Sequence, residues 1–283
     1  MFHFHAKLLL TAAIASLGLT TVASAADLPA RTYTKAPVMP PVFNWSGFYI
    51  GGFAGYAWAD GNASATEPAT ATGAFYNGTG LPTTYGLKGS FLGGGTIGYN
   101  WQAPGSNFVF GLEGEAGYLH VRGSRQDVNA FNAGLSPIDS VNTTRIGDAY
   151  GVIAGRIGYA WDRTLLYAKG GVAFVGHSSS FNDSCIGPGA PGCGPGFLVI
   201  NRSDTQTTYA LGAGVEYAFT PNWSIKGEYL YLGTRQTNTS SNLSVAAPAN
   251  VLFTNSNSDP GIHTVKVGVN YRFNWGAPVV AKY

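Results

Sequence analysis

Apolar and non-apolar residues alternate in eight stretches of about ten to twelve residues, and the gaps between these stretches alternate between long and short. The gaps are, in order, 59–89 (long), 102–107 (short), 120–148 (long), 162–163 (short), 176–206 (long), 220–222 (short) and 233–262 (long). A barrel across an outer membrane has this plan, because strands of about ten residues cross the bilayer between tight turns on one side and long loops on the other. The pattern predicts an all-β fold, an eight-stranded antiparallel up-and-down transmembrane β-barrel over residues 45–275.

The composition argues against a nucleic-acid-binding protein. Only 11% of the 283 residues are charged, which is less than half the share of an ordinary globular protein, and the formal net charge is +2. The lysines and arginines are scattered and form no basic run of the kind that contacts phosphate backbones.

The N-terminus has the features of a secretory signal. Lys7 supplies the positive flank, Leu8–Val22 is an apolar and small-residue core, and Ala23–Ala25 is a cleavage site of the A-x-A type. A lone membrane helix is the alternative, but this core is short and a cleavage site follows it. We expect residues 1–25 to be removed, residues 26–44 to form a proline-rich periplasmic leader, and residues 276–283 to form a C-terminal tail.

Charged residues within the alternating stretches fall on the opposite face from the apolar ones, since neighbouring side chains on a strand point in opposite directions. Four acids and five bases would then face one space. They are Glu113, Glu115, Arg156, Lys169, Glu216, Lys226, Glu228, Lys266 and Arg272.

The alternation alone does not say which face lies inside, because a soluble barrel would have its apolar residues inside and its charged residues outside. The near balance of charges suits an enclosed ion-pair network, and the export signal directs the chain to where an outer membrane exists. Aromatic residues also gather beside the short turns, where a lipid-facing girdle is expected. They are Tyr99, Trp101, Tyr159, Trp161, Phe219, Trp223, Tyr271 and Phe273. We therefore expect lipid on the apolar face and ions within.

An eight-stranded barrel has an interior just wide enough for side chains to fill. The packed charges should plug it or leave a thin water path. Glu113 and Glu115 could in principle be paired catalytic carboxylates, but a filled interior offers no substrate cleft.

Several motifs carry a family resemblance. They are Asn44–Gly52, Arg156–Trp161, Leu165–Gly171, Gly212–Leu232 and His263–Phe273. Together they resemble the alphaproteobacterial outer-membrane immunogenic protein family, small porin-like barrels of the OmpA type. The resemblance covers the strands and short turns but not the long loops. It implies surface-exposed loops and no catalytic residues, and family members are variously structural proteins, antigens, small porins or haemin binders.

The C-terminus departs from the usual pattern of such barrels, many of which end on the aromatic residue that closes the last strand. That residue would be Phe273, yet the chain continues to Tyr283. The sequence leaves both as candidates for the signal read by the barrel assembly machinery.

Cys185 and Cys193 are the only cysteines, and an exported chain favours a disulfide between them. A metal site with His177 is the alternative, although zinc sites need more ligands at closer spacing. His120, His177 and His263 are expected to be exposed polar residues, with haem ligation as the sharper hypothesis.

The sequence thus predicts an integral protein of the cell outer membrane with periplasmic mature termini, in contact with outer-membrane lipid and lipopolysaccharide. Its predicted role is envelope structure and surface presentation, with a narrow small-solute pore as a further hypothesis. The alternative is a haemin or host-surface receptor built from the loops. No cofactor, metal or enzymatic activity is predicted, and a hydrolase at the outer rim is the rival that would need a serine, a histidine and an acid grouped there.

Overall fold

The computed structural model describes residues 43–66, 76–78, 81–127, 130–132, 136–137, 140–183, 198–243 and 252–273. The chain divides into Met1–Pro41 and Val42–Tyr283, and every described residue belongs to the second unit. All regular elements in these ranges are β-strands. A search of the same residues finds no helix that could cross a membrane.

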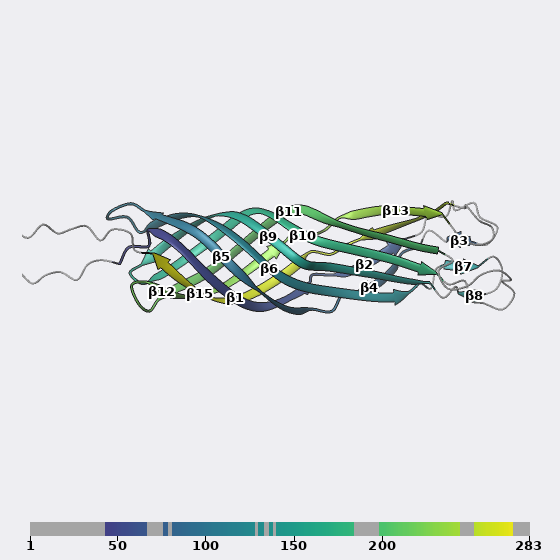
Figure 1. Ribbon diagram of the computed structural model, residues 1–283, viewed down its shortest axis with the longest axis horizontal. Helices are drawn as coiled ribbons and strands as arrows, with labels where there is room; N and C mark the ends of the chain where they lie inside the picture. The colour runs from purple at the N-terminus through teal and green to yellow at the C-terminus, as the bar shows by residue number, and fades with distance from the viewer. Residues whose placement is uncertain are drawn as a thin grey trace, which may run out of the picture. The chain divides into compact units, whose positions relative to one another are not determined.

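Eight strands close into one barrel in the order β1-β15-β12-β11-β10-β9-β6-β5, and every neighbouring pair is antiparallel (Figure 1). Their bounds are β1 (Gly47–Ala59), β5 (Ser90–Gln102), β6 (Phe108–Gln126), β9 (Val141–Trp161), β10 (Thr164–Asp183), β11 (Leu198–Ala218), β12 (Trp223–Leu232) and β15 (Ile262–Phe273). This confirms the predicted eight-stranded up-and-down barrel.

The apolar face of each barrel strand is the outer face. Leu112 and Val267 are 61% and 58% exposed, whereas Glu115 and Lys226 are buried. A water-soluble barrel would have the opposite arrangement, since exposed apolar side chains on every strand need lipid around them.

The strands continue far into the segments that were predicted to be loops. β6, β9, β10 and β11 have 19 to 21 residues, about twice the length that crosses a bilayer. Two further sheets lie in the same segments, and their order is β13-β14-β2-β4 and β3-β7-β8. Their bounds are β2 (Asn62–Thr66), β3 (Tyr76–Gly78), β4 (Thr83–Gly86), β7 (Ala130–Asn132), β8 (Ser136–Pro137), β13 (Thr237–Leu243) and β14 (Leu252–Ser258).

This extension was missed because its strands are rich in serine, threonine and asparagine on both faces and show no apolar alternation. Hydrogen bonding to the neighbouring strand maintains such segments without an apolar face. In β13, for example, Thr239 and Ser241 bond to Ser256 and Thr254 on β14 through their hydroxyl groups.

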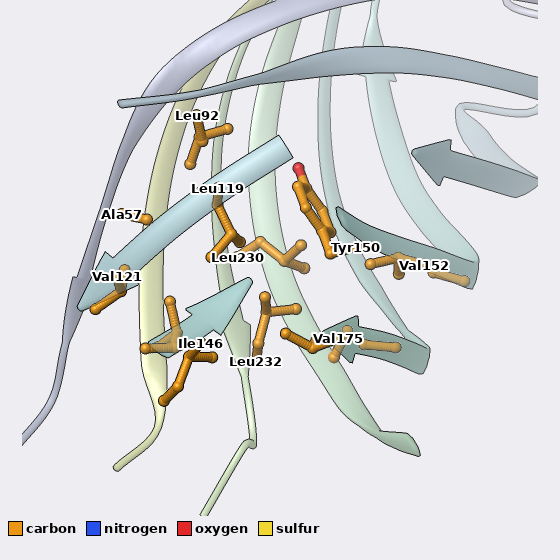
Figure 2. Close-up of a cluster of buried hydrophobic side chains, with 14 of the residues drawn as sticks. Ala57, Leu92, Leu119, Val121, Ile146, Tyr150, Val152, Val175, Leu230 and Leu232 are labelled. Carbon is orange, nitrogen blue, oxygen red and sulfur yellow. The ribbon is translucent and has the colours of Figure 1, made fainter. Parts of the chain in front are cut away.

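The barrel interior also contains large apolar side chains, where only small and charged residues were expected. Figure 2 shows one such cluster, in which Leu119 of β6, Ile146 of β9, and Leu230 and Leu232 of β12 point inward. A second cluster surrounds Trp45 near the short turns. Several of these residues lie at or beyond the strand ends that alternation predicted, so their inward direction was not apparent from the sequence.

Candidate functional site: the filled interior of the barrel

Eight charged side chains form one connected network in the middle of the barrel. Four are acids and four are bases, so their formal charges cancel. Each side chain is at most 4% exposed. They are Glu113, Glu115, Glu216, Glu228, Arg156, Lys169, Lys226 and Lys266.

Lys169 on β10 occupies the centre of this network. Its ammonium group lies 2.8 Å from Glu113, 3.0 Å from Glu115 and 2.7 Å from Glu228. These carboxylates come from β6 and β12, so one lysine joins three strands across the interior. Charge-assisted contacts of this length are among the strongest polar contacts in proteins.

Two further lysines complete the neutralisation of the same carboxylates. Lys266 lies 2.5 Å from Glu115 and 2.8 Å from Glu228. Lys226 lies 3.3 Å from Glu113 and 3.9 Å from Glu228. Each of the three carboxylates therefore meets at least two ammonium groups.

Arg156 extends the network toward the short turns. Its guanidinium lies 3.0 Å from Glu216 and 3.5 Å from Glu113. Glu216 also accepts hydrogen bonds from the Ser224 hydroxyl and the Asn270 amide, at 2.5 and 2.9 Å. A buried carboxylate is tolerated when its lone pairs are satisfied in this way.

Three tyrosines that the sequence reasoning did not single out donate to the network. Tyr49 bonds Glu113 at 2.7 Å, Tyr150 bonds Glu115 at 2.7 Å, and Tyr167 bonds Glu228 at 2.8 Å. The strand parity that placed the charges inside could have found Tyr49 and Tyr167, because each lies between two outward-facing residues.

Each of these tyrosines packs over a glycine directly opposite on the neighbouring strand. The register pairs Tyr49 with Gly98, and the ring of Tyr49 fills the space that a side chain at position 98 would need. Tyr167 lies in the same way over Gly214. The glycines therefore make room for the rings that hold the carboxylates, in a barrel too narrow for both.

Arg272 does not join the network, although it was predicted to be one of its members. Its guanidinium lies 4.5 Å from the ring centre of Phe43 and 5.3 Å from that of Trp45, and it donates to the Pro221 carbonyl at 2.8 Å. No carboxylate of the described residues lies within 4.0 Å of it. Arg272 is second from the end of β15, where the Trp45 cluster occupies the interior and no acid is within reach.

The network leaves little space for a solute or a metal ion. A cavity of about 10 Å³ beside Tyr49, Glu216 and Asn270 has room for about one water molecule. Oxygen atoms of Glu113, Glu115 and Glu228 lie within 4.8 Å of one another, a spacing that could hold a cation. Lys169 contacts all three carboxylates and already supplies the positive charge.

The predicted aromatic residues lie on the outer wall near the short turns and contact one another. Ring centres are 5.0 Å apart for Trp223 and Tyr271, and 4.7 Å apart for Tyr159 and Trp161. Trp101 and Phe219 are about half exposed, and Tyr99 and Phe273 lie on the same wall. These contacts are the arrangement expected of a girdle at the membrane–water boundary.

A second aromatic group, which the sequence reasoning missed, lies at the opposite end of the strands. Tyr56, Trp58, Phe91 and Tyr231 belong to it, and His263 stacks on Trp58 at 5.5 Å. The length of the apolar stripe between the two aromatic groups defines the part of the wall that faces lipid. The missed signal was the recurrence of tyrosine and tryptophan at both ends of each stripe.

His177, which was expected to be exposed, is buried beyond the outer aromatic group. Its Nδ1 lies 3.2 Å from Asp204, and its Nε2 lies 2.9 Å from Asp259. Burial acts to lower the pKa of His177, but the hydrogen bonds to Asp259 and Asp204 outweigh it, so the pKa is above 6.5. The alternation of apolar and non-apolar residues ends before position 177 in the sequence, so the inward direction of His177 was not predicted.

Cys185 and Cys193 lie outside the described residues, as do residues 1–42 and 274–283. Phe43 and Trp45, at the predicted junction of leader and barrel, pack together with ring centres 5.2 Å apart.

A closed antiparallel barrel with an apolar outer wall between two aromatic groups, filled by a neutral ion-pair network, is an integral outer-membrane protein. The chain belongs to the outer membrane protein beta-barrel domain family, whose model matches residues 12–273. It is located in the cell outer membrane.

Sequence relatives agree with this assignment and with the resemblance described above. The chain is 32% identical over 272 residues to the 31 kDa outer-membrane immunogenic protein of Brucella melitensis, which covers 94% of this chain and 100% of the relative. It is 27% identical over 200 residues to the 22 kDa outer membrane protein of Rhizobium leguminosarum bv. viciae, covering 70% and 67% respectively. Among solved structures, OprG from Pseudomonas aeruginosa matches at 13% identity and a TM-score of 0.43, over 81% of this chain and 97% of OprG.

Proposed function

We propose that this protein is a closed structural barrel that stabilises the outer membrane and presents its long segments at the cell surface. The observation that carries the proposal is the neutral network around Lys169, whose members are buried and paired across the interior. Apolar layers around Trp45 and around Leu119 lie next to this network. A path for hydrated ions would have to open all three layers.

Conductance of the folded, full-length protein in a planar bilayer tests this proposal. We expect no discrete conductance steps from the wild-type barrel, after insertion has been verified by heat-modifiable mobility on a gel. Steps in the wild type that change size in a Lys169→Ala/Glu228→Ala variant would show that the interior conducts. The small-solute pore would then replace the structural role.

The proposal includes a topology and a processing scheme. We propose that residues 1–25 are removed on export, that residues 26–44 and 276–283 remain in the periplasm, and that the barrel assembly machinery inserts the strands. The short turns support this orientation, because outer-membrane barrels have their tight turns on the periplasmic side. The segments that carry β2, β4, β13 and β14 would then lie outside the cell.

Haemin binding is the alternative, and the described histidines do not favour it. Both ring nitrogens of His177 contact carboxylates, Nδ1 of His120 contacts Asp148, and Nδ1 of His263 contacts the Tyr229 hydroxyl at 2.6 Å. A spectral titration with haemin is expected to show no Soret shift that depends on these residues. A shift that is lost in His177→Ala or His120→Ala would support the receptor role instead.

The enzymatic alternative requires a serine activated by a histidine. Within the described part of the chain, no serine hydroxyl is hydrogen-bonded to a histidine ring nitrogen. The matched relatives are themselves named as outer-membrane proteins.

A further inference from the structure

Three cationic side chains lie side by side on the outer wall of the barrel. Lys88 pairs with Arg122 through an isolated bridge, and Arg122 pairs with Arg145 in the register of β6 and β9. Residues directly opposite in antiparallel strands share a face and have Cβ atoms about 4.5–5.5 Å apart. Val121 and Ile146, the neighbours of Arg122 and Arg145 along the strands, are fully buried, so these two arginines point outward. Lys88 is exposed and, as the partner of Arg122, shares this face. We call Lys88, Arg122 and Arg145 the cationic row.

The three positive charges of the cationic row are not neutralised by the carboxylates around them. Asp148 contacts Arg145 at 3.3 Å and also His120 at 2.8 Å. Lys88 and Arg122 have no carboxylate within 4.0 Å among the described residues. Like charges placed directly opposite destabilise a sheet, so this arrangement calls for an external anion.

Other exposed arginines at this end of the barrel differ in this respect. Arg202 lies 2.9 Å from Asp204, and Arg235 lies 2.8 Å from Asp60. The unbalanced positive charge is therefore specific to the side of the wall formed by β6 and β9.

Along the strands, the row lies at the outer boundary of the headgroup layer of a bilayer. Lys88 is three residues beyond Phe91, which is 83% exposed and faces lipid, and Arg122 is four residues beyond Tyr118. At about 3.3 Å per residue and a tilt of about 40°, the row lies roughly 8–10 Å beyond these rings. The headgroup layer begins at the rings and is about 5–8 Å thick, so the backbone of the row lies at its outer boundary, and long lysine and arginine side chains can reach back to the phosphates.

An open hollow adjoins the row. Ser178 pairs with Arg145, and Ser203 pairs with Ser178, so the row continues in register as two hydroxyl groups. The hollow, of about 360 Å³, is lined by Arg145, both serines and Asp148. It lies where the register of β9 and β10 shifts.

A bulge in β9 forms this hollow. The register shifts between Val175 and His177, and Gly147 and Asp148 have φ values of 115° and 69°. A bulge of this kind bends a strand and turns a side chain toward a new partner. Here it turns Asp148 toward His120 and Arg145 and leaves space beside them.

We propose that the cationic row binds the phosphate groups of an outer-leaflet lipopolysaccharide headgroup, whose sugar enters the hollow beside Ser178 and Ser203. Phosphate accepts hydrogen bonds from guanidinium and ammonium groups in paired geometry. The site lies on the outer wall, so it does not depend on whether the interior conducts.

Binding of purified bisphosphorylated lipid A to the refolded full-length protein in detergent micelles tests this site. Removing one surface cation near anionic headgroups should weaken binding about fivefold. We expect Arg122→Gln and Arg145→Gln to show this loss singly, and a larger loss together. Arg163→Gln, at a short turn on the opposite end, is the matched control and should bind as the wild type does. Heat-modifiable gel mobility verifies that each variant is folded.

The phosphate dependence separates lipid from other anions. Enzymatically dephosphorylated lipid A should bind the wild type no better than bisphosphorylated lipid A binds the double variant. Inorganic phosphate at the same concentration should not compete. The proposal is wrong if the double variant binds lipid A as the wild type does, if Arg163→Gln loses as much affinity, or if dephosphorylated lipid A binds equally well.

Discussion

The ammonium group of Lys169 lies 2.7 Å from the Glu228 carboxylate, and both side chains are almost completely shielded from solvent. Lys169 also contacts Glu113 and Glu115, so a single cation from β10 compensates part of the charge of three acids. The stability of the barrel interior should therefore be sensitive to this one residue.

Replacement of this lysine gives the first prediction. Lys169→Met keeps much of the side-chain volume but leaves buried carboxylates short of one positive charge, which should lower the free energy of unfolding by about 3–5 kcal/mol. Urea unfolding in lipid vesicles, followed by tryptophan fluorescence, measures it. The double variant Lys169→Met/Glu228→Gln restores neutrality and should recover part of the loss. A loss below about 0.5 kcal/mol would mean that water screens the pairs.

A pair of glycine substitutions tests the packing of the tyrosines. Gly98→Ala places a methyl group against the ring of Tyr49, which hydrogen bonds hold in place, and should cost about 1–3 kcal/mol. Gly155→Ala is the matched control, because a Cβ there has no neighbour within 4 Å. The control should not destabilise the barrel, since alanine is favoured over glycine in a strand. Equal losses in both variants would contradict the proposed fit of ring over glycine.

The lipid-facing wall gives a third prediction. Val267→Arg places a charge on the outer surface of β15, where it should cost roughly 2–4 kcal/mol if this position is near the bilayer midplane. Asn201→Arg, at an exposed position in the polar extension of β11, should change the unfolding free energy by less than about 0.5 kcal/mol. Unfolding in vesicles measures both, and a tolerated arginine at position 267 would show that this face does not contact lipid.

His177 should make the stability of the outer extension depend on pH. Its folded pKa is raised above 6.5 by Asp259 and Asp204 despite burial, so the folded protein binds the His177 proton more tightly than the unfolded chain does. This contribution is complete below pH 6.5 and is lost as the pH rises through the folded pKa. The protection of amides in β10 and β14 against hydrogen exchange, measured relative to an unstructured chain at the same pH, should fall over that range.

His177→Gln removes the titrating group and should abolish this part of the pH dependence of protection, leaving protection at low pH weaker than in the wild type. A wild-type protection profile that is flat from pH 6 to pH 9 would contradict the assignment.

The membrane-spanning part of the fold could be predicted from strand parity, because Lys266 and Val267 must lie on opposite faces and only one face carries charge. The partners inside could not be predicted. The contact of Glu115 with Lys266 crosses the interior between β6 and β15, and its formation depends on barrel tilt and side-chain length. Arg272 shares the parity of Lys266, yet it lies beside Trp45. Parity predicts whether a side chain points inward or outward, but not which interior residues lie at its level along the barrel axis.

The outer half of the fold could not be predicted for a different reason. Ile146 and His177 point inward from strands that have polar residues on both faces, so no alternation marked them. The cationic row was likewise hidden, since Lys88, Arg122 and Arg145 are scattered in the sequence and become neighbours only through register.

The network around Lys169 also constrains how the protein can enter a bilayer. Its contacts join residues as far apart as Glu115 and Lys266, on strands that are not adjacent in the barrel. A single hairpin inserted alone would expose unpaired ammonium and carboxylate groups to hydrocarbon. Insertion and ring closure should therefore occur as one concerted event, with β1 and β15 meeting before the ions lose contact with water.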